Sequence, residues 1–184
     1  MKGTRDIVIL VLFAAVAGGA LSGVYSVTKG KIAAAAERER AEALKAVLPT
    51  LSEQARPVVI QHEGRSIPAV IDGGVGAFKG AVLELETRKG YAGLIRFLVG
   101  VDADLKITGL YILQQSETPG LGTKAKDRAW WGQFLGKGQE GFRFKVKKDG
   151  GDVESITAAT ITSRAVTDQV DFGLRALAAH LGKR

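Results

Sequence analysis

The sequence predicts an α+β protein in which a single N-terminal transmembrane helix precedes one domain, with an antiparallel sheet flanked by helices. Three observations lead to this fold class. Residues 7–28 carry no charged side chain, short β-like runs broken by glycines fill residues 58–113, and apolar side chains return at helical spacing over residues 166–181. Because the strands form one group with helices at the two ends, the order favours an α+β domain over alternating βαβ units.

The uncharged segment 7–28 is the expected membrane anchor. As a helix it reaches roughly 33 Å, which is enough to cross a hydrocarbon core of about 30 Å. A cleaved signal peptide is the competing interpretation, because Lys2 and Arg5 precede the apolar run and small residues follow it. The length of the uncharged stretch favours an uncleaved anchor. The same two charges place the N-terminus in the cytoplasm by the positive-inside rule, although Lys29 and Lys31 flank the other end.

The residues after the anchor form an expected helical stalk. They are almost all strong helix formers, and the run ends before Pro49. The chain is therefore expected to have three parts: a membrane anchor over 1–28, a helical stalk over 29–50 and an extracytoplasmic domain over 51–184.

Within the domain, glycine-bounded apolar runs predict the strands. We expect a meander of strands at 58–61, 66–71 and 80–87, with breaks at Gly64, Gly73, Gly74 and Gly76, and then a hairpin of 93–101 with 106–113. A short helix over 127–134, a strand over 142–147, a break at Gly150 and Gly151, and the final helix should follow.

Cysteine is absent and there are two histidines, His62 and His180. Thiolate-ligated iron–sulfur clusters, zinc knuckles and cysteine nucleophiles are therefore excluded from this chain. Any redox chemistry needs an organic cofactor. No catalytic acid or base and no metal site is expected, because histidines in loop and helix-end settings favour surface roles.

The basic residues outnumber the acidic ones, 26 to 19, and give a formal charge of +7. They are spread along the chain, which suits a surface facing anionic membrane lipid or an acidic partner. Nucleic-acid binding is not expected, because the nearest basic stretch, residues 142–148, is explained more simply as an alternating strand with solvated lysines.

A cluster of hydroxyls, TAATITS at 157–163, comes immediately before the final helix. Its position at a helix N-terminus, where backbone N–H groups lack partners, favours an anion such as a phosphate. The alternative is that Thr160, Thr162 or Ser163 simply caps the helix, as Ser and Thr commonly do. This stretch alone leaves both interpretations open.

A turn-rich loop, residues 116–124, follows the expected hairpin. Its proline and two glycines, Gly120 and Gly122, fix the backbone and allow the close approach of a flat ligand. Leu121 offers an apolar contact, and Glu117 and Thr118 offer polar ones.

Three motifs in order, GYAG at 90–93, SETPGLG at 116–122 and TAATITS at 157–163, give the chain a family resemblance. It resembles the FMN-binding domain of membrane-anchored electron-transfer subunits, above all the G subunit of the Rnf ion-translocating electron transport complex. The C subunit of the sodium-translocating NADH:quinone reductase is a relative of that protein. The resemblance runs from the anchor to the last helix.

The resemblance implies a covalent FMN. In that family the FMN phosphate is joined to a threonine, in a motif close to Asp-x-x-Ser/Thr-Gly-Ala-Thr. Carried over, the modified residue is Thr160, with Thr157 and Ala159 at preceding motif positions. Here Glu154 stands where aspartate is usual and Ala158 where glycine is usual.

A shifted register of this motif would move the attachment point and its acid. Asp152 could be a substitute acid only with such a shift, and Thr162 and Ser163 are the next candidate acceptors. The remaining contacts to the flavin are expected from Tyr91 and from the loop residues Glu117, Thr118, Gly120, Leu121 and Gly122. Trp130 and Trp131 are further candidates to neighbour the ring, but packing is the favoured role for both.

The implied function is electron transfer by one component of an ion-translocating oxidoreductase of the NAD:ferredoxin type, rather than by a stand-alone enzyme. Its partners are the other subunits of the complex, a flavin transferase that makes the chain a phosphoprotein, and membrane lipid. The implied location is the bacterial inner membrane, with a single span and the FMN domain on the periplasmic face. The alternatives are a tethered scaffold domain of the same fold without cofactor, and the C subunit of the quinone reductase.

Overall fold

The computed structural model describes residues 2–73 and 77–182. The expected breaks at Gly74 and Gly76 lie outside the described residues. The chain divides into two compact units, one ending at Ala41 and one beginning at Glu42. Each unit is described by itself.

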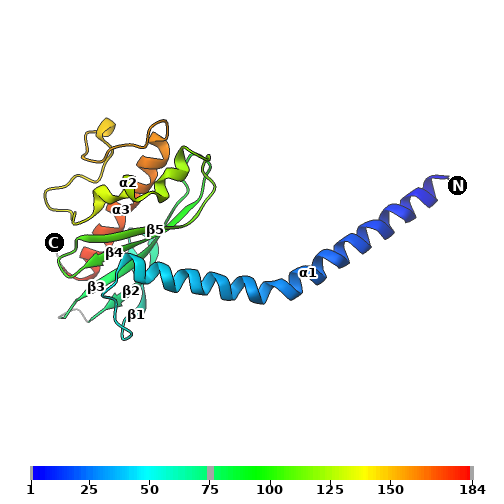
Figure 1. Cartoon of the computed structure of the whole chain (residues 1–184), viewed down its shortest axis with the longest axis horizontal. Helices are drawn as coiled ribbons and strands as arrows, with labels where there is room; N and C mark the ends of the chain where they lie inside the picture. Colours follow the sequence, from blue (N-terminus) through cyan, green and yellow to red (C-terminus); the bar gives the residue numbers. More distant parts are fainter. Residues whose placement is uncertain (1, 74–76, 183–184) are drawn as a thin grey trace. The chain divides into compact units, whose positions relative to one another are not determined.

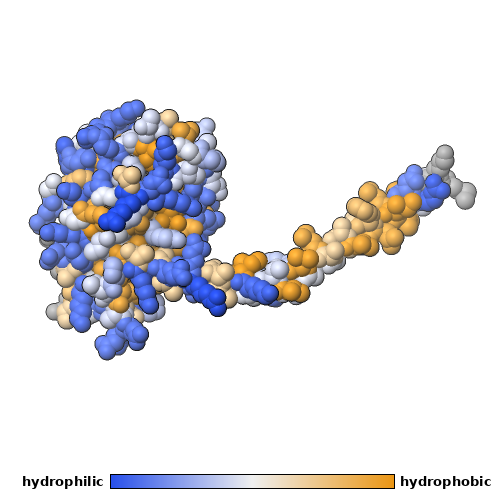
Figure 2. Space-filling model, viewed as in Figure 1, coloured by the Kyte–Doolittle hydropathy of each residue, from blue (hydrophilic) through white to orange (hydrophobic). Residues whose placement is uncertain are grey.

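The first unit is formed by helix α1, Lys2–Val47, which continues into the first residues of the second. No proline interrupts its 46 residues, so one helix covers both the expected anchor and most of the expected stalk. The part from Gly3 is long and apolar enough to cross a membrane, with a mean hydropathy of 2.5 over its 18-residue window. Figure 2 shows apolar side chains exposed along this helix, as a lipid-facing segment requires.

The second unit is built on a five-stranded antiparallel sheet in the order β1-β2-β3-β4-β5, which Figure 1 shows as neighbouring arrows. The strands are β1 Arg56–His62, β2 Arg65–Asp72, β3 Gly80–Thr87, β4 Ile95–Asp102 and β5 Ile107–Gln115. Each pairs with its neighbours in the chain, so the predicted meander and hairpin are confirmed. Glu63 and Gly64, with φ of 47° and 73°, form the tight turn between β1 and β2.

Helix α3, Thr160–His180, covers one face of this sheet and contacts β1 and β3. Its apolar side packs with alternate strand residues: Leu83 and Leu85 of β3 belong to this core with Val166 and Leu177 of the helix. Gly173 allows the close approach, because a Cβ there would lie 2.8 Å from the Leu85 side chain. The predicted final helix is therefore confirmed.

The opposite face of the sheet carries a smaller core. It contains Ala43, Val47 and Leu48 from the end of α1 and the residue after it, packed with Val82 of β3 and Leu98 of β4. Val82 points away from its neighbours Ala81 and Leu83 because successive strand residues face opposite sides. The strands β3 and β4 are thus buried on both faces.

Two glycines allow the end of α1 to touch the sheet backbone. Gly100 of β4 and Gly109 of β5 are paired across the strands. A Cβ at Gly109 would lie 2.7 Å from the Cα of Val47, and a Cβ at Gly100 would collide with the Val47 carbonyl. That carbonyl, one of the helix-end acceptors without an intrahelical donor, accepts a hydrogen bond from the Thr108 hydroxyl at 2.5 Å.

Short helical turns connect the sheet to α3. These are η1 Gly122–Lys126, α2 Arg128–Trp131, η2 Gly132–Phe134 and η3 Lys147–Asp149. The helix expected at 127–134 is therefore present as α2 continued by η2.

The strand predicted over 142–147 is wrong. The apolar side chains of this segment do alternate, with Phe144 and Val146 buried between exposed neighbours. Its backbone, however, pairs with its own continuation through a single bridge, Val146 with Val153, and not with the sheet. The break at Gly150 folds the chain back too soon for a ladder to form. Alternation here reports burial of every second side chain and not strand pairing.

Gly100→Ala tests the contact between α1 and the sheet. Its Cβ meets backbone that cannot move without shifting the helix, so we expect the free energy of unfolding to fall by about 1–3 kcal/mol. The measurement is chemical unfolding of the whole chain in detergent. Gly132→Ala is the matched control, because its Cβ meets only a flexible side-chain atom at 3.8 Å. Equal effects of the two changes would contradict the close approach.

Asp72 gives the domain an acid-sensitive contact. The backbone N–H and the hydroxyl of Ser52 donate to its two carboxylate oxygens at 2.9 and 2.8 Å, and they lower the pKa of Asp72 below its ordinary value of 3.8. Because the folded-state pKa is the lower one, the contact stabilises the domain above pH 3.8 and this contribution is lost as the pH falls through the folded value. We expect Asp72→Asn to flatten the acid limb of stability against pH, measured by thermal unfolding. An unchanged acid limb would contradict this.

Candidate cofactor site

The N-terminus of α3 lacks a side-chain cap. Its N-cap is Ala159, whose methyl group cannot accept a hydrogen bond. Ser163 faces inward instead: its hydroxyl accepts from the N–H of Ile156 and donates to the carbonyl of Ala159, both at 2.9 Å. Capping alone therefore does not explain the hydroxyl cluster. Among the residues that the structure describes, no N-cap side chain accepts a hydrogen bond from the first-turn N–H groups, which also lack intrahelical acceptors as at any helix start.

A tight turn brings the chain into this helix. Ala158 has a φ of 60°, in the left-handed region that favours glycine. The geometry thus explains why glycine is suited to position 158, and alanine there carries backbone strain of about 1–2 kcal/mol. Thr157 and Ala158 are exposed, Thr160 is half-buried and Thr162 is buried.

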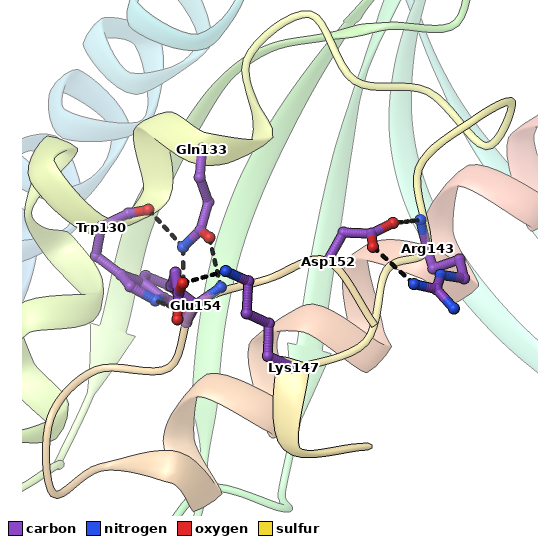
Figure 3. A network of polar contacts seen from close by, with 6 residues as sticks. All are labelled: Trp130, Gln133, Arg143, Lys147, Asp152 and Glu154. Atoms are coloured by element: carbon purple, nitrogen blue, oxygen red, sulfur yellow. Dashed lines mark hydrogen bonds and ion pairs between the residues drawn. The ribbon is translucent and has the colours of Figure 1, made fainter. Parts of the chain in front are cut away.

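The segment before this turn is held by side chains in place of a sheet neighbour (Figure 3). Gln133 accepts from the N–H of Glu154 at 2.7 Å and donates to its carbonyl at 3.2 Å, and the indole N–H of Trp130 donates to the same carbonyl at 2.7 Å. The Glu154 carboxylate pairs with Lys147, and Asp152 pairs with Arg143. These contacts fix the chain that leads to the hydroxyl cluster.

Trp130 and Trp131 have packing roles in the structure. Trp130 is buried edge-on against Phe134, and Trp131 packs against the same core while its indole donates to the Lys126 carbonyl. The interpretation of the two tryptophans as packing residues agrees with these contacts.

The loop after β5 is folded on its own backbone. The Thr118 carbonyl accepts from the N–H groups of Leu121 and Thr123, and the N–H of Gly120 donates to the Thr123 hydroxyl at 2.9 Å. Gly120 has a φ of 76°, which glycine adopts without strain. The loop is therefore a shaped element and not a flexible link.

Glu117 joins this loop to two other segments. It is 4% exposed, and its Oε1 accepts from the N–H of Ala92 at 2.9 Å while its Oε2 accepts from the hydroxyl of Thr162 at 2.5 Å. Glycine is needed on both sides: a Cβ at Gly90 or Gly122 would lie 2.7 or 2.5 Å from the carboxylate oxygens. All three motifs thus meet at one carboxylate.

A cavity of about 480 Å³ opens beside this carboxylate. This volume is in the range of small-molecule and cofactor sites. Its wall is made by Tyr91, Glu117, Thr118, Leu121, Gly122, Ala158, Ala159, Thr160, Ile161 and Thr162. Three large apolar side chains of this wall, those of Tyr91, Leu121 and Ile161, are 71%, 39% and 47% exposed.

Most of the site residues predicted from the sequence line this one cavity. They are Tyr91, Glu117, Thr118, Leu121, Gly122, Ala159 and Thr160. Thr157 and Gly120 are not among the lining residues, although each is close in sequence to residues that are.

Ala158 and Ile161 line the cavity without having been predicted as flavin contacts, and Thr162, the alternative acceptor, lines it as well. Ile161 could have been predicted from the sequence. It is an apolar residue among hydroxyl residues at the start of a helix, and an exposed apolar side chain there indicates a binding surface.

Comparisons with known proteins agree with this geometry. A family model described as an FMN-binding domain matches residues 90–175, and one described as the RnfG N-terminal region matches residues 5–47. The crystal structure of Shewanella oneidensis NqrC is similar with a TM-score of 0.50 and 19% identity, covering 76% of this chain and 73% of that one. At this identity the likeness shows the fold alone. Fold and site thus define a membrane-anchored protein with an FMN-binding domain.

Proteins of similar sequence show to which family of this class the chain belongs. The G subunit of the ion-translocating oxidoreductase complex of Aliivibrio fischeri is 34% identical over 180 residues, covering 90% of this chain and 86% of the relative. Its counterparts from Escherichia coli K12 and Methanosarcina acetivorans are 35% and 30% identical, covering 88% and 97% of this chain and 84% and 96% of their own lengths. The chain belongs to the family of G subunits of ion-translocating oxidoreductase (Rnf) complexes.

Ala158→Gly tests the strained turn before α3. Removing the left-handed strain outweighs the added freedom of glycine in the unfolded chain, so we expect the free energy of unfolding to rise by about 0.5 kcal/mol. Ala159→Gly, at a φ of −133°, is the control and should lower it by about 0.5–1 kcal/mol. Both are measured by chemical unfolding. A loss of stability in Ala158→Gly would contradict the assigned strain.

Proposed function

We propose that this protein carries FMN covalently, as a phosphoester to Thr160, and passes electrons within its ion-translocating complex. The observation that carries the proposal is the cavity whose wall joins Thr160 at the start of α3 to the loop 117–122 and to Tyr91. Family membership gives the FMN-binding domain and the complex. The bond to Thr160 is the added step.

The phosphate end of the cofactor suits the start of α3. That helix has 21 residues, no acidic side chain in its first turn and no side-chain cap. Its N–H groups and dipole would stabilise a phosphate charge by about 0.3–1 kcal/mol. Thr160 is half-buried on the cavity wall, so its hydroxyl can be reached from outside. A covalent bond also prevents loss of the cofactor from a domain outside the cytoplasm.

The ring end of the cofactor suits the rest of the wall. Tyr91, Leu121 and Ile161 provide apolar surface that is exposed to solvent without a ligand, and Thr118 provides a polar group. When bound, FMN supplies the electron-carrying chemistry, and the protein positions it and excludes side reactions. We assign no catalytic acid or base, and Thr157 and Gly120 act by shaping the two segments that bear the contacts.

The proposal extends to location and maturation. We place the N-terminus in the cytoplasm and the FMN domain on the periplasmic face of the bacterial inner membrane, with an anchor over 1–28, a stalk over 29–50 and the domain over 51–184. Arg5 at the short end of α1 supports this orientation by the positive-inside rule. A flavin transferase attaches the cofactor, and lipid surrounds the uncharged part of α1.

Thr160→Ala tests the attachment. We expect wild-type chain, produced together with a flavin transferase, to show flavin fluorescence that stays with the denatured band, and Thr160→Ala to lose it because the acceptor oxygen is gone. Thr50→Ala, which removes an exposed hydroxyl outside the cavity, is the control and should keep the signal.

The same experiment separates the competing functions. A dark wild-type band with a flavin absorbance spectrum in the native protein would mean non-covalent FMN. A dark band without that spectrum would favour a cofactor-free scaffold.

A further inference from the structure

The carboxylate of Glu117 is fully engaged inside the protein. Its two oxygens accept from the N–H of Ala92 and from the hydroxyl of Thr162, so each oxygen faces a different segment. Thr162 is 1% exposed, and Glu117 is separated from it by 45 residues in the chain. A buried hydrogen bond to a charged acceptor is worth more than a neutral one. This contact therefore fixes the first turn of α3 against the loop.

Fixing Thr162 also orients Thr160. Residues two apart on an α-helix point to nearly opposite sides. Both residues line the cavity, but the Thr162 side chain is buried and bonded to Glu117, whereas Thr160 is half-buried. The Thr162 hydroxyl donates its only proton to Glu117 and is buried, so of these two hydroxyls only that of Thr160 stays available.

The glycines around Glu117 show that its carboxylate is packed closely against the neighbouring backbone. The carboxylate fills the space in which a side chain at Gly90 or Gly122 would begin. The backbone N–H of Glu117 is held as well, by the amide oxygen of Gln115 at 2.6 Å. A small displacement of Glu117 would therefore move the loop, the turn at Ala92 and the helix start together.

We propose that Glu117 is the positioning residue of the attachment site: through Thr162 it sets the rotation of the first turn of α3 and leaves Thr160 as the accessible acceptor. This rests on the proposed function. In the attachment, the Thr160 oxygen bonds to the phosphorus of the FMN half of a flavin dinucleotide while the P–O bond of the diphosphate breaks; a nucleoside monophosphate leaves, the hydroxyl proton passes to solvent, and the flavin oxidation state does not change. Glu117 takes no part in that exchange.

The test measures attachment and folding separately. Full-length Glu117→Gln, Thr162→Val, the double variant and Thr162→Ser are each produced with a flavin transferase, and covalent flavin per chain is measured over time in denaturant. The flavin-bearing residue is identified by mass spectrometry of the tryptic peptide 149–164. Glu86→Gln, an exposed carboxylate paired with Arg96, is the control. The same changes made in the Thr160→Ala chain report on unfolding without the cofactor.

We expect Glu117→Gln and Thr162→Val each to slow attachment by about 10²-fold, as a misplaced reacting group does. The double variant should be no slower than either single one, because both remove the same contact. Thr162→Ser keeps the hydroxyl and should restore the wild-type rate, and Glu86→Gln should not change it. If the contact had a merely structural role, Thr162→Ser would not restore the attachment rate while the slow variants, made in the Thr160→Ala chain, still unfold cooperatively.

Wild-type attachment in Glu117→Gln, multiplying effects in the double variant or a slow Thr162→Ser would overturn the positioning role. If Glu117→Gln does not fold, the Thr162→Val and Thr162→Ser pair decides, since a slow Thr162→Val with a normal Thr162→Ser still requires the hydroxyl. Wild-type chain without covalent flavin would instead overturn the proposed function. In that case, the interaction free energy between the changes at positions 117 and 162, measured from unfolding of the Thr160→Ala chain, would still show whether the hydrogen bond between Glu117 and Thr162 forms.

Discussion

A single buried carboxylate holds the site together. Glu117 receives hydrogen bonds from the turn before β4 and from the first turn of α3, two segments that are far apart in the chain. The sheet and α3 supply a rigid frame, because both faces of the sheet are packed. Within that frame the carboxylate joins the loop after β5 to the turn at Ala92 and to the first turn of α3, so three segments that line the site are connected.

Local sequence patterns predicted the strands correctly where strand pairing was the cause of the pattern. The runs at 58–61, 66–71 and 80–87 and the following hairpin were predicted because alternation and glycine breaks coincide with paired strands. At 142–147 the alternation had another cause, since Phe144 packs against Phe134 and Val146 is buried beside its bridge to Val153, while the backbone turns back on itself. Alternation of apolar residues indicates which side chains are buried, but it does not indicate which segment the backbone pairs with.

The site was predictable only as separate motifs. The loop 116–122 and the cluster 157–163 were recognised from their residues, but the contact between Glu117 and Thr162 joins positions that no local pattern relates. Glu117 was expected as a polar group at the ligand; the structure shows its oxygens directed to Ala92 and Thr162. The left-handed turn at Ala158 was indicated only by the glycine that is usual at this motif position, because alanine itself gives no sign of a positive φ.

The glycines that surround the carboxylate have a consequence for the history of the family. Gly90 and Gly122 leave room for the carboxylate of Glu117, and Thr162 donates a hydrogen bond to it from the helix. A larger residue at 90 or 122 clashes with the carboxylate, loss of the Thr162 hydroxyl removes one of its donors, and loss of the carboxylate leaves the Thr162 hydroxyl and the Ala92 N–H without their acceptor. In a lineage that keeps the cofactor, these positions should therefore be inherited as a block, and glycine at 90 should persist even with a shorter side chain at 117, because the carbonyl of Gly93 would still lie 2.7 Å from a Cβ there.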